Sequence, residues 1–409
     1  MQKGMFRLVQ EVQKKILLLG GSAQQIVAIE TAKRLGYYTI LCDFLPDNPG
    51  QYYSDKFFLV STTDKEAILS IAKNEQVNGV LAYASDPAAP TAAYVAEKIG
   101  LPGNPYSSVD TLCNKDKFRV FLQENGFNTP RSYSCSSAEE VFENIRQLNL
   151  PVIVKPVDSS GSKGITVLHS LENLKEAVEF AFAFSRSNRI IVEEFIEKNH
   201  PYLIGGDIFI VNGKVVLWGM LNCHRSNLVN PLVPVGKSYP LELSCNDIQN
   251  VQITLQTMID KLHIDTCAMN VELVIDKNSK VWLIDVGPRS GGNMIPDLLS
   301  LIFGIDIVEM SVKAAMGESL KIELNDGVPY YATYNLHSKK NGKFNELRYS
   351  EKIKSHIVKE CIYKKKGDTV KYFDNASKAL GIIFLKFGSL EEMQLLLSDI
   401  DKHVKVIVS

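Results

Sequence analysis

Short apolar runs alternate with helical patterns over the first hundred residues of the chain. The run Lys15–Gly21 ends on a pair of glycines, and Gln24–Leu35 then places apolar residues at helical spacing. A second helical pattern, Asp64–Lys73, lies among three further strand-like runs. These runs are Tyr37–Asp43, Lys56–Val60 and Gly79–Tyr83. Such alternation predicts a parallel sheet that helices cover on both faces.

The glycine pair at the end of the first strand is an incomplete dinucleotide-binding motif. Asp43 follows Gly20 at about the distance that a Rossmann fingerprint requires. However, Ser22–Gln25 stand where the remaining glycines should lie. We therefore interpret the pair as a turn at the edge of a Rossmann-like sheet, without a nicotinamide cofactor.

Gly100–Ser108, rich in Gly, Pro and Ser, is the first strong break in the pattern. Beyond it, Thr111–Asn125 has the pattern of one helix. Ser137 with Glu140 forms a capping-box pattern before a second helix, and a third helix is expected to be capped at Ser170. These elements predict that a second region begins near residue 110.

Two hairpins are predicted in the middle of the chain. Gly205–Leu221 has the residues for a turn at Asn212–Gly213, and Ala268–Gly292 has those for a turn near Lys277–Ser279. Before them, Arg189–Lys198 has the pattern of a buried strand that continues into a linker.

From Lys321 onward, strands and a helix at Ser389–Leu397 predict a smaller C-terminal piece. The chain of 409 residues is long enough for about two to four domains with buried cores. A net charge of −1 with 22% charged residues gives no reason to expect a nucleic-acid or anionic-membrane partner.

Targeting signals and cysteine usage narrow the class of protein further. The longest apolar runs, such as Ile16–Leu19, are too short to span a bilayer. Met1–Gln13 lacks the apolar segment of a signal peptide. Seven cysteines without a CxxC pair are typical of a reducing compartment. We therefore expect a cytoplasmic protein.

Two carboxylates lie inside the apolar strands of the second hairpin. Glu272 is in the middle of NVELVI, and Asp285 is in the middle of VWLIDVG. If the strands pair around Asn278, both acids can point to the same face. An unpaired carboxylate is costly to bury, whereas two carboxylates on one face can hold Mg²⁺ against phosphates. The alternative is a pair of solvent-facing acids on an exposed sheet.

A lysine and a Gly/Ser-rich loop form a second candidate site. Lys155 ends the strand-like run VIVKP, and the loop Asp158–Gly164 follows it with a second lysine. Such a loop can offer phosphates a positive charge and several backbone N–H donors. It is not a Walker A motif, because Lys163 precedes a glycine and no Ser or Thr follows. Taken alone, the loop could equally be a plain surface turn.

Five short motifs occur in one order between Asn114 and Gly292. They are NKDKFR, VIVKP with its Ser/Gly loop, IIVEEFI, NVEL and LIDVGPRSGG. Together they resemble the ATP-grasp superfamily, close to the carboxylate–amine ligases that join an acid to an amine with ATP. The resemblance extends from Lys14 to about Gly317.

The resemblance implies an α/β fold that is α+β in its ATP-grasp part. Residues 1–110 would form a Rossmann-like preATP-grasp domain. Residues 111–320 would form an ATP-grasp domain of two α+β subdomains, with the lid subdomain at about 111–195. Residues 321–409 would form a small C-terminal α/β domain.

The resemblance also implies roles for individual residues. The lysines that contact ATP phosphates would be Lys115 and Lys155. The lid over the triphosphate would contribute Ser159, Ser160, Gly161, Ser162 and Gly164. The linker that holds adenine would contribute Glu193, Glu194 and Ile196. The ligands of Mg²⁺, or of Mn²⁺ as an alternative ion, would be Glu272 and Asp285.

Two arginines are expected to meet the substrate. By resemblance, Arg289 would steer the substrate carboxylate or its acyl phosphate. The alternative is that Arg289 pairs with Asp285 or Glu272 across the strand end. Arg225 is a candidate anion contact, and the alternative is a surface arginine.

The sequence departs from the family pattern at two points. Gly287 stands where the family has a metal-site Asn, so a third metal oxygen must come from water, phosphate or another side chain such as Asn293. The acidic residue that meets the ribose is also missing after the linker, and Asp207 is a candidate replacement.

The implied activity is an ATP- and Mg²⁺-dependent, ADP-forming ligase that makes an amide or peptide bond through an acyl phosphate. Its partners would be a small-molecule acid and an amine, without nucleic acid or membrane, and a homodimer is the assembly to consider. Two alternatives stay open: a purine-biosynthesis enzyme similar to phosphoribosylglycinamide synthetase, and a non-catalytic ATP-binding sensor. Met1–Leu101 has no basic cluster at its predicted strand ends, which favours an acceptor that is not a nucleotide.

Overall fold

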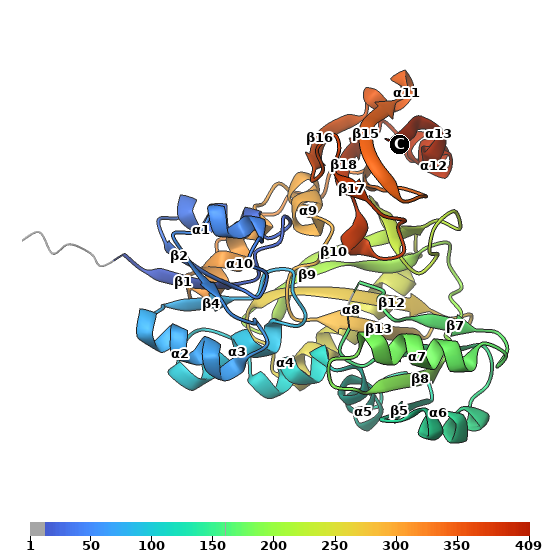
Figure 1. The fold of residues 1–409 in the computed structure, drawn as a ribbon, viewed down its shortest axis with the longest axis horizontal. Helices are drawn as coiled ribbons and strands as arrows, with labels where there is room; N and C mark the ends of the chain where they lie inside the picture. The colour runs from blue at the N-terminus through green and yellow to red at the C-terminus, as the bar shows by residue number, and fades with distance from the viewer. Residues whose placement is uncertain (1–12, 160) are drawn as a thin grey trace, which may run out of the picture.

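The computed structural model describes residues 13–159 and 161–409. Its N-terminal part is a parallel sheet in the order β3-β2-β1-β4, as the alternating pattern predicts (Figure 1). The strands are β1 (Lys15–Leu19), β2 (Tyr38–Asp43), β3 (Lys56–Leu59) and β4 (Gly79–Leu81). The helices are α1 (Ile26–Arg34), α2 (Lys65–Glu75) and α3 (Ala89–Ile99). Alternate residues of β1 enter two different apolar cores, so both faces of the sheet are covered.

The loop that follows β2 packs over the turn after β1. Gly21 donates its backbone N–H to Oδ2 of Asp43 at 2.7 Å. A Cβ on Gly21 would lie 2.1 Å from Oδ1 of Asn48, and one on Gly50 would lie 2.7 Å from the backbone of Gly21. The predicted edge turn is therefore packed under the loop that follows β2. A pyrophosphate could not approach the backbone of Gly21 as closely as a dinucleotide site requires.

The segment Thr111–Asn125, predicted as one helix, is two helices. They are α4 (Tyr106–Cys113) and α5 (Lys115–Glu124). Asn114 between them is extended, with φ −119° and ψ 111°. The prediction is wrong because of a long-range contact: the N–H of Lys115 donates to the carbonyl of Val157 at 2.9 Å. The break places Lys115 in the first turn of α5.

A second, antiparallel sheet follows in the order β5-β8-β6-β7. Its elements are β5 (Ser132–Cys135), α6 (Ala138–Asn144), β6 (Val152–Pro156), β7 (Thr166–Leu168), α7 (Leu174–Phe184) and β8 (Ile190–Glu194). Ser137 accepts the N–H of Glu140, so the predicted cap of α6 is confirmed. The predicted cap at Ser170 is wrong. α7 begins four residues later, because residues 169–173 turn after β7 and leave Leu171 42% exposed.

The largest sheet has the strand order β13-β12-β9-β10-β11-β14-β18-β16 (Figure 1). Its first five strands are β9 (Leu203–Val211), β10 (Lys214–Arg225), β11 (Pro234–Tyr239), β12 (Cys267–Ile275) and β13 (Val281–Gly287). Both predicted hairpins are confirmed, and Asn212 and Gly213 form the first turn with φ of 49° and 75°. Helices α8 (Cys245–Leu262) and α9 (Ile295–Phe303) pack into separate apolar cores against this sheet.

Residues beyond 320 contribute to two sheets. β14 (Tyr331–Leu336), β16 (Ile357–Ile362) and β18 (Gly381–Lys386) extend the large sheet. A small sheet contains β15 (Gly342–Tyr349), β17 (Thr369–Val370) and β19 (Val404–Val408), with α11 (Glu351–Lys354), α12 (Leu390–Ser398) and α13 (Ile400–His403) nearby. The predicted helix Ser389–Leu397 is α12, capped by Ser389. Because the large sheet runs across residue 320, the domain boundaries at residues 110 and 320 stay predictions.

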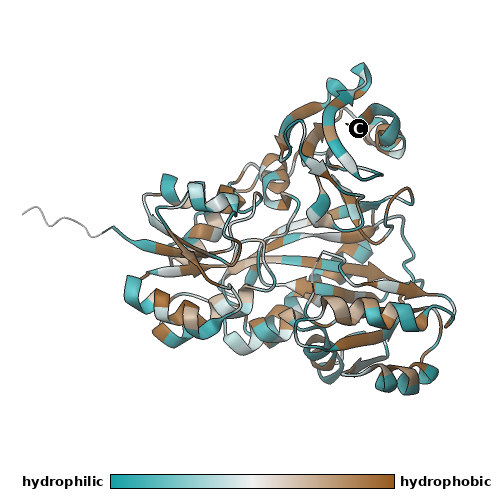
Figure 2. Ribbon diagram, in the orientation of Figure 1, coloured by the Kyte–Doolittle hydropathy of each residue, from teal (hydrophilic) through white to brown (hydrophobic). Residues whose placement is uncertain are grey.

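Helix α10 (Ile307–Ala315) joins the first sheet to the large sheet. Its Val312 packs in a core of the first sheet, and its Met310 packs in a core of the large sheet. Arg34 on α1 adds an ion pair with Asp306 at 2.7 Å. Figure 2 shows apolar residues along the inner strands, with polar residues on the outer helix surfaces. Among the described residues, no helix is both long and apolar enough to cross a membrane.

Candidate active site

Glu272 on β12 and Asp285 on β13 are direct cross-strand partners. Paired residues of an antiparallel sheet lie on the same face, so the prediction that the two acids share a face is confirmed. The side chain of Asp285 is 42% exposed. The acidic pair therefore lies on a partly exposed face of the sheet and not on the face that packs into the apolar core.

Lys115 connects this acidic pair to the loop after β6. Its Nζ lies 3.2 Å from Oδ2 of Asp285 and donates to the carbonyl of Ser159 at 3.0 Å. The surrounding protein partly desolvates Asp285, which would raise its pKa, but the charges of Lys115 and Lys155 outweigh that effect and hold the pKa below its usual range. Asp285 is therefore ionised at neutral pH, as a metal ligand must be.

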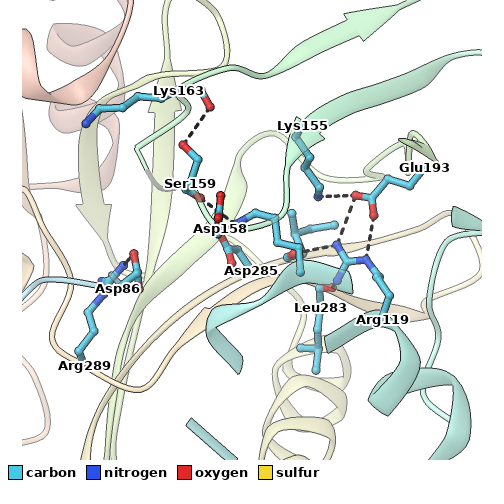
Figure 3. Close-up of polar contacts among 12 residues, drawn as sticks. Asp86, Arg119, Lys155, Asp158, Ser159, Lys163, Glu193, Leu283, Asp285 and Arg289 are labelled. Atoms are coloured by element: carbon cyan, nitrogen blue, oxygen red, sulfur yellow. Dashed lines mark hydrogen bonds and ion pairs between the residues drawn. The ribbon is translucent and has the colours of Figure 1, made fainter. Parts of the chain in front are cut away.

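Lys155 lies in a buried charge cluster with Glu193 and Arg119 (Figure 3). Glu193 accepts hydrogen bonds from Lys155 and, at 2.9 Å, from Nε of Arg119. Burial lowers the pKa of Lys155 to about 8, although the carboxylate of Glu193 opposes that shift. Burial would raise the pKa of Glu193, but the positive charges of Arg119 and Lys155 outweigh this effect and lower the pKa to about 2. The cluster is paired, as buried charges must be.

Arg119 was not identified from the sequence. It also donates to the carbonyls of Leu283 (3.3 Å) and Ile284 (2.8 Å) on β13, immediately before Asp285. This one side chain therefore ties the antiparallel sheet to the strand that carries an acid of the site (Figure 3). A signal was present, because Arg119 follows Lys115 by one helical turn in NKDKFR and lies on the same face of the helix.

The two acids of the predicted adenine linker point to opposite faces of β8, as consecutive strand residues do. Glu193 faces the buried cluster, whereas Glu194 accepts from the backbone N–H (3.0 Å) and side-chain amide (2.9 Å) of Asn149. Ile196 is half-buried and follows the end of the strand. Of the two carboxylates, only that of Glu193 lies beside Lys155.

The predicted lid, Asp158–Gly164, bridges two parts of the molecule. Asp158 is anchored at its start, where it accepts the backbone N–H of Ser187 at 2.8 Å. Near its other end, the Ser162 hydroxyl donates to the carbonyl of Leu232, in the loop before β11, at 2.9 Å. The lid therefore extends from the antiparallel sheet to the loop before β11 of the large sheet.

Inside the lid, the Ser159 hydroxyl donates to the carbonyl of Lys163 at 3.1 Å. Positive φ angles occur at Gly161 (68°), Ser162 (61°) and Gly164 (71°). Among the described residues, nothing lies within 4 Å of where a Cβ on Gly161 would be. The side chain of Lys163 extends away from the Lys155 cluster (Figure 3). Ser160 lies outside the described residues.

A second residue missed from the sequence, Lys237 on β11, lies on the face of the acidic pair. Gly205 is the cross-strand partner of Glu272, so any side chain at residue 205 would share the face of Glu272. A Cβ built there would lie 3.1 Å from Nζ of Lys237 and 2.8 Å from Sγ of Cys223. Gly205 therefore leaves the space in which the lysine reaches across β10 toward Glu272.

The ammonium of Lys237 is buried without an acidic ion-pair partner among the described residues. Its hydrogen-bond acceptor is Sγ of Cys223 at 2.6 Å. Burial raises the pKa of the Cys223 thiol, although Lys237 opposes that shift. A neutral thiol leaves the charge of Lys237 available to a bound anion. The signal in the sequence was a lysine in the strand-like run PVGKSY.

Arg225 is the last residue of β10. It is half-buried, and its Nη1 is buried without a hydrogen-bond partner in the described part of the chain. An unpaired buried guanidinium N–H is costly unless a ligand completes it. The geometry therefore supports Arg225 as an anion contact and does not support a plain surface arginine.

Arg289 follows β13 and forms a two-point ion pair with Asp86, in the loop after β4. Its Nε donates to Oδ1 of Asp86 at 2.6 Å, and its Nη1 donates to the carbonyl of Ser290 at 2.9 Å. Burial would lower the pKa of Arg289, but Asp86 outweighs it and raises that pKa. The expected alternative, a pair with Asp285 or Glu272, is not the arrangement found. Asp86 was missed because its partner lies 203 residues away.

Asp86 also explains the departure at Gly287. A Cβ on residue 287 would lie 2.3 Å from Oδ1 of Asp86, so the family Asn would displace the Asp86–Arg289 pair. Asn293, considered as a replacement metal ligand, donates its backbone N–H to Gln24 at 2.7 Å. Its role toward a metal stays a prediction.

Asp207 was a candidate ribose contact and lies instead beneath the turn after β13. It is 1% exposed, and its carboxylate accepts from the backbone of Gly291 (2.7 Å) and the side chain of Asn270 (2.8 Å). Burial raises its pKa, although these hydrogen bonds oppose the shift. A buried carboxylate with both oxygens bonded cannot reach a ribose, so Asp207 supports the turn that carries Arg289.

The protein groups fit a divalent ion held jointly with phosphate. Within the described residues, no group of three or more His, Cys, Asp or Glu side chains gathers as a metal site. The acidic pair of Glu272 and Asp285 therefore supplies two oxygen ligand groups, and phosphate or water oxygens must supply the others. Hard ions such as Mg²⁺ take this kind of mixed coordination.

Comparison with known proteins identifies a family. The model of the carbamoyl-phosphate synthase L chain, ATP binding domain, matches residues 114–323, which is just over half of the chain. The carbamoyl phosphate synthase large chain of Thermotoga petrophila is 25% identical over 307 residues, or 72% of this chain and 27% of that protein. The formate-dependent phosphoribosylglycinamide formyltransferase of Synechococcus sp. WH7803 is 35% identical over 187 residues, or 44% of this chain and 48% of that protein.

Solved structures show the same fold along almost the whole chain. An L-amino acid ligase from Bacillus licheniformis superposes with a TM-score of 0.81 at 22% identity, covering 98% of this chain and 100% of that one. A phosphoribosylglycinamide synthetase from Anaerococcus prevotii superposes with a TM-score of 0.74 at 23% identity, covering 97% and 100%. The chain spans only about a quarter of the length of the carbamoyl phosphate synthase relative. The family match confirms the predicted resemblance: this chain belongs to the carbamoyl-phosphate synthase L chain ATP-binding family, within the ATP-grasp superfamily.

Proposed function

We propose that this chain is an ATP- and Mg²⁺-dependent ligase that activates a carboxylate as an acyl phosphate and transfers the acyl group to an amine. One observation carries the proposal. Lys115 bonds Asp285 of the acidic pair and the carbonyl of Ser159 in the lid, so the metal-binding face and the phosphate-binding loop meet at one ammonium. Family membership supports the same assignment.

In this function, the nucleotide lies between the antiparallel sheet and the large sheet. Lys115 and Lys155 contact phosphate oxygens, and the backbone around Glu193 and Ile196 holds the adenine. The acidic pair holds Mg²⁺, or Mn²⁺ in its place, which neutralises and orients the phosphates when it is bound. Glu193 fixes the position of Lys155 before the nucleotide arrives.

The attack of a carboxylate on the γ-phosphate brings two anions together, so the site must neutralise both. Buried cations perform this task by position and electrostatics. Arg225 and Lys237 are suited to it, because each is at least half-buried and neither has an acidic ion-pair partner among the described residues. The lid, which already contacts Leu232, would keep water away from the acyl phosphate.

The nature of the acceptor is the second part of the proposal. A phosphoribosyl substrate, as the names of two relatives suggest, would need cations at the carboxyl ends of the first sheet. Neither Gly20–Gln25 nor Tyr83–Ala88 contains a lysine or arginine, and Asp86 adds a negative charge there. The lack of lysine and arginine in these two loops favours an amine substrate that carries no phosphate.

An assay of ADP release tests the proposal. The purified chain would be incubated with ATP, Mg²⁺ and pairs of acids and amines. We expect ADP release that requires both an acid and Mg²⁺, with a new amide among the products. ATP binding without acid-dependent ADP release across the panel would favour the sensor. Release that depends on phosphoribosylamine would favour the purine-pathway alternative.

A further inference from the structure

One two-point face of the Arg289 guanidinium, Nε together with Nη2, is already occupied by an internal carboxylate. Asp86 takes both Nε and Nη2, and the Ser290 carbonyl takes Nη1. The pair is mostly buried, with side-chain exposures of 13% for Arg289 and 23% for Asp86. Figure 3 shows it beside the acidic strand, away from the Lys155 cluster. A substrate carboxylate that grips Arg289 through the same two-point fork must displace Asp86.

Displacement creates a charge problem that the protein does not solve alone. The released Asp86 would be a carboxylate in a largely buried place, next to the incoming carboxylate. Like charges at such short range repel, and an unpaired buried charge is strongly unfavourable. Among the described residues, Asp86 has no ion-pair partner besides Arg289. Its own loop, Tyr83–Ala88, contains no lysine or arginine.

A ligand that carries its own ammonium solves this problem. If the ammonium is attached one or two carbons from the carboxylate, the ligand replaces one ion pair with two, carboxylate to Arg289 and ammonium to Asp86. A simple carboxylic acid would leave Asp86 unpaired. Resting on the proposed ligase function, we infer that Asp86 is a specificity-determining residue and that the acid substrate is an amino acid, held by Arg289 and Asp86 together.

Gly287 independently supports the placement of Asp86 beside Arg289. Its missing side chain is the space that Oδ1 of Asp86 occupies, at 2.3 Å from the position of a Cβ. The resemblance places an Asn near the metal at this position. This chain has Gly287 there instead, and the carboxylate of Asp86, from the loop after β4, fills the space of the missing side chain. The loop of Asp86 also turns through Ala84, whose φ of 52° is a conformation that residues other than glycine rarely adopt.

The test is a binding experiment without nucleotide, so that it does not depend on turnover. Isothermal titration would compare alanine, leucine, phenylalanine and glutamate with propionate, 4-methylpentanoate, 3-phenylpropionate and glutarate, which are the same skeletons without the amino group. We expect at least one amino acid to bind about 10-fold or more tightly than its counterpart, the scale of one charged hydrogen-bonded contact.

Two substitutions make the comparison specific. In Asp86→Asn, the preference for the amino group should fall to within about 2-fold, and the simple acid should bind more tightly than to the native chain, because its internal competitor is gone. Asp86→Glu keeps the charge and should retain part of the preference. Asp47→Asn, on the exposed loop after β2, is the control and should leave binding unchanged.

The inference is overturned if no amino acid of the panel binds more tightly than its counterpart, or if Asp86→Asn keeps the full preference. The ratio within one variant does not depend on how much of the protein is folded. Failure of the ligase function would look different: the amino-group preference would be present, but no pair of substrates would release ADP. ADP release with simple acids and no amino-group preference would retain the ligase function and reject the role of Asp86.

Discussion

Glu272 allows the sharpest test of the acidic pair at the residue scale, because it forms no ion pair within the described residues that its loss would break. Glu272→Gln keeps the shape and removes one charge from the metal site. We expect an unchanged melting temperature and a fall in kcat of at least ~100-fold, the scale of a major electrostatic contribution. Steady-state ADP release measures the effect, with the exposed Glu172→Gln as the control. Near-normal turnover would remove Glu272 from the metal site.

Arg289→Lys tests whether a two-point guanidinium contact holds the carboxylate of the substrate acid. Lysine keeps the charge but cannot donate two parallel N–H bonds to one carboxylate. We expect the KM for the acid to rise about 10-fold or more, with ATP affinity within about 2-fold of native. A parallel fall in ATP affinity would place Arg289 on the γ-phosphate. A lower melting temperature with normal kinetics would mean that its pair with Asp86 is only structural.

The pH dependence of ATP binding should report on Lys155. Its pKa is about 8 in the nucleotide-free chain, because burial disfavours the charged form more than Glu193 restores it. Lys155 is therefore charged below pH 8 and loses its charge as the pH rises through that value. We expect ATP affinity to fall above pH 8, and Lys155→Arg to remove that fall because arginine stays charged. Equal pH profiles for the two proteins would mean that another group controls binding.

At the scale of elements, the lid is the segment whose motion should respond to the nucleotide. In the part of the chain that the structure describes, open space surrounds a Cβ position at Gly161, and Ser162 donates a hydrogen bond to Leu232 in the loop before β11. Hydrogen exchange should be fast for residues 161–164 without ATP and at least ~10-fold slower with it. The amides of β6, paired on both sides, serve as the control. Slow exchange in the free chain, unchanged by ATP, would make the loop a static turn.

The elements that the sequence predicts correctly depend on local chemistry. Hairpin turns such as Asn212–Gly213 and caps such as Ser137 are determined by neighbouring residues. The errors arise where a distant group intervenes. Asn114 breaks a helix because the next N–H bonds Val157, which no periodicity of residues 111–125 reveals.

The candidate site divides in the same way. Acids and lysines inside motifs, such as Glu272 and Lys155, could be identified from the sequence, because a charged residue in an apolar strand is itself a signal. Asp86 and Lys237 could not be assigned roles, since their importance appears only when the fold brings Arg289 and Gly205 beside them. The prediction of a homodimer stays a prediction, because the structure describes a single chain.

At the scale of the whole molecule, the continuous large sheet decides how the C-terminal residues can be treated. β14 is hydrogen-bonded along β11, from Tyr331 opposite Tyr239 to Tyr334 opposite Gly236, and this pairing includes Lys237. A chain that stops at residue 320 would lose β14 and leave β11 as an unprotected edge. We expect such a chain to aggregate and to lose measurable ADP release, as light scattering and the activity assay would detect.

Removal of residues 404–409 is the comparison, because it deletes β19 from the small sheet and leaves the strand order of the large sheet whole, although β15 then loses a partner and the shared apolar core loses Val404 and Val408. That shorter chain should be less stable than the native chain but keep more ADP release than the chain that stops at residue 320. Equal behaviour of the two truncations would contradict the role assigned to β14. The wider consequence concerns modularity: although the family match ends at residue 323, the segment after it is not an exchangeable appendage. Transplanting residues 114–323 into another protein would transfer the motifs and leave the strand of Lys237 without its neighbour.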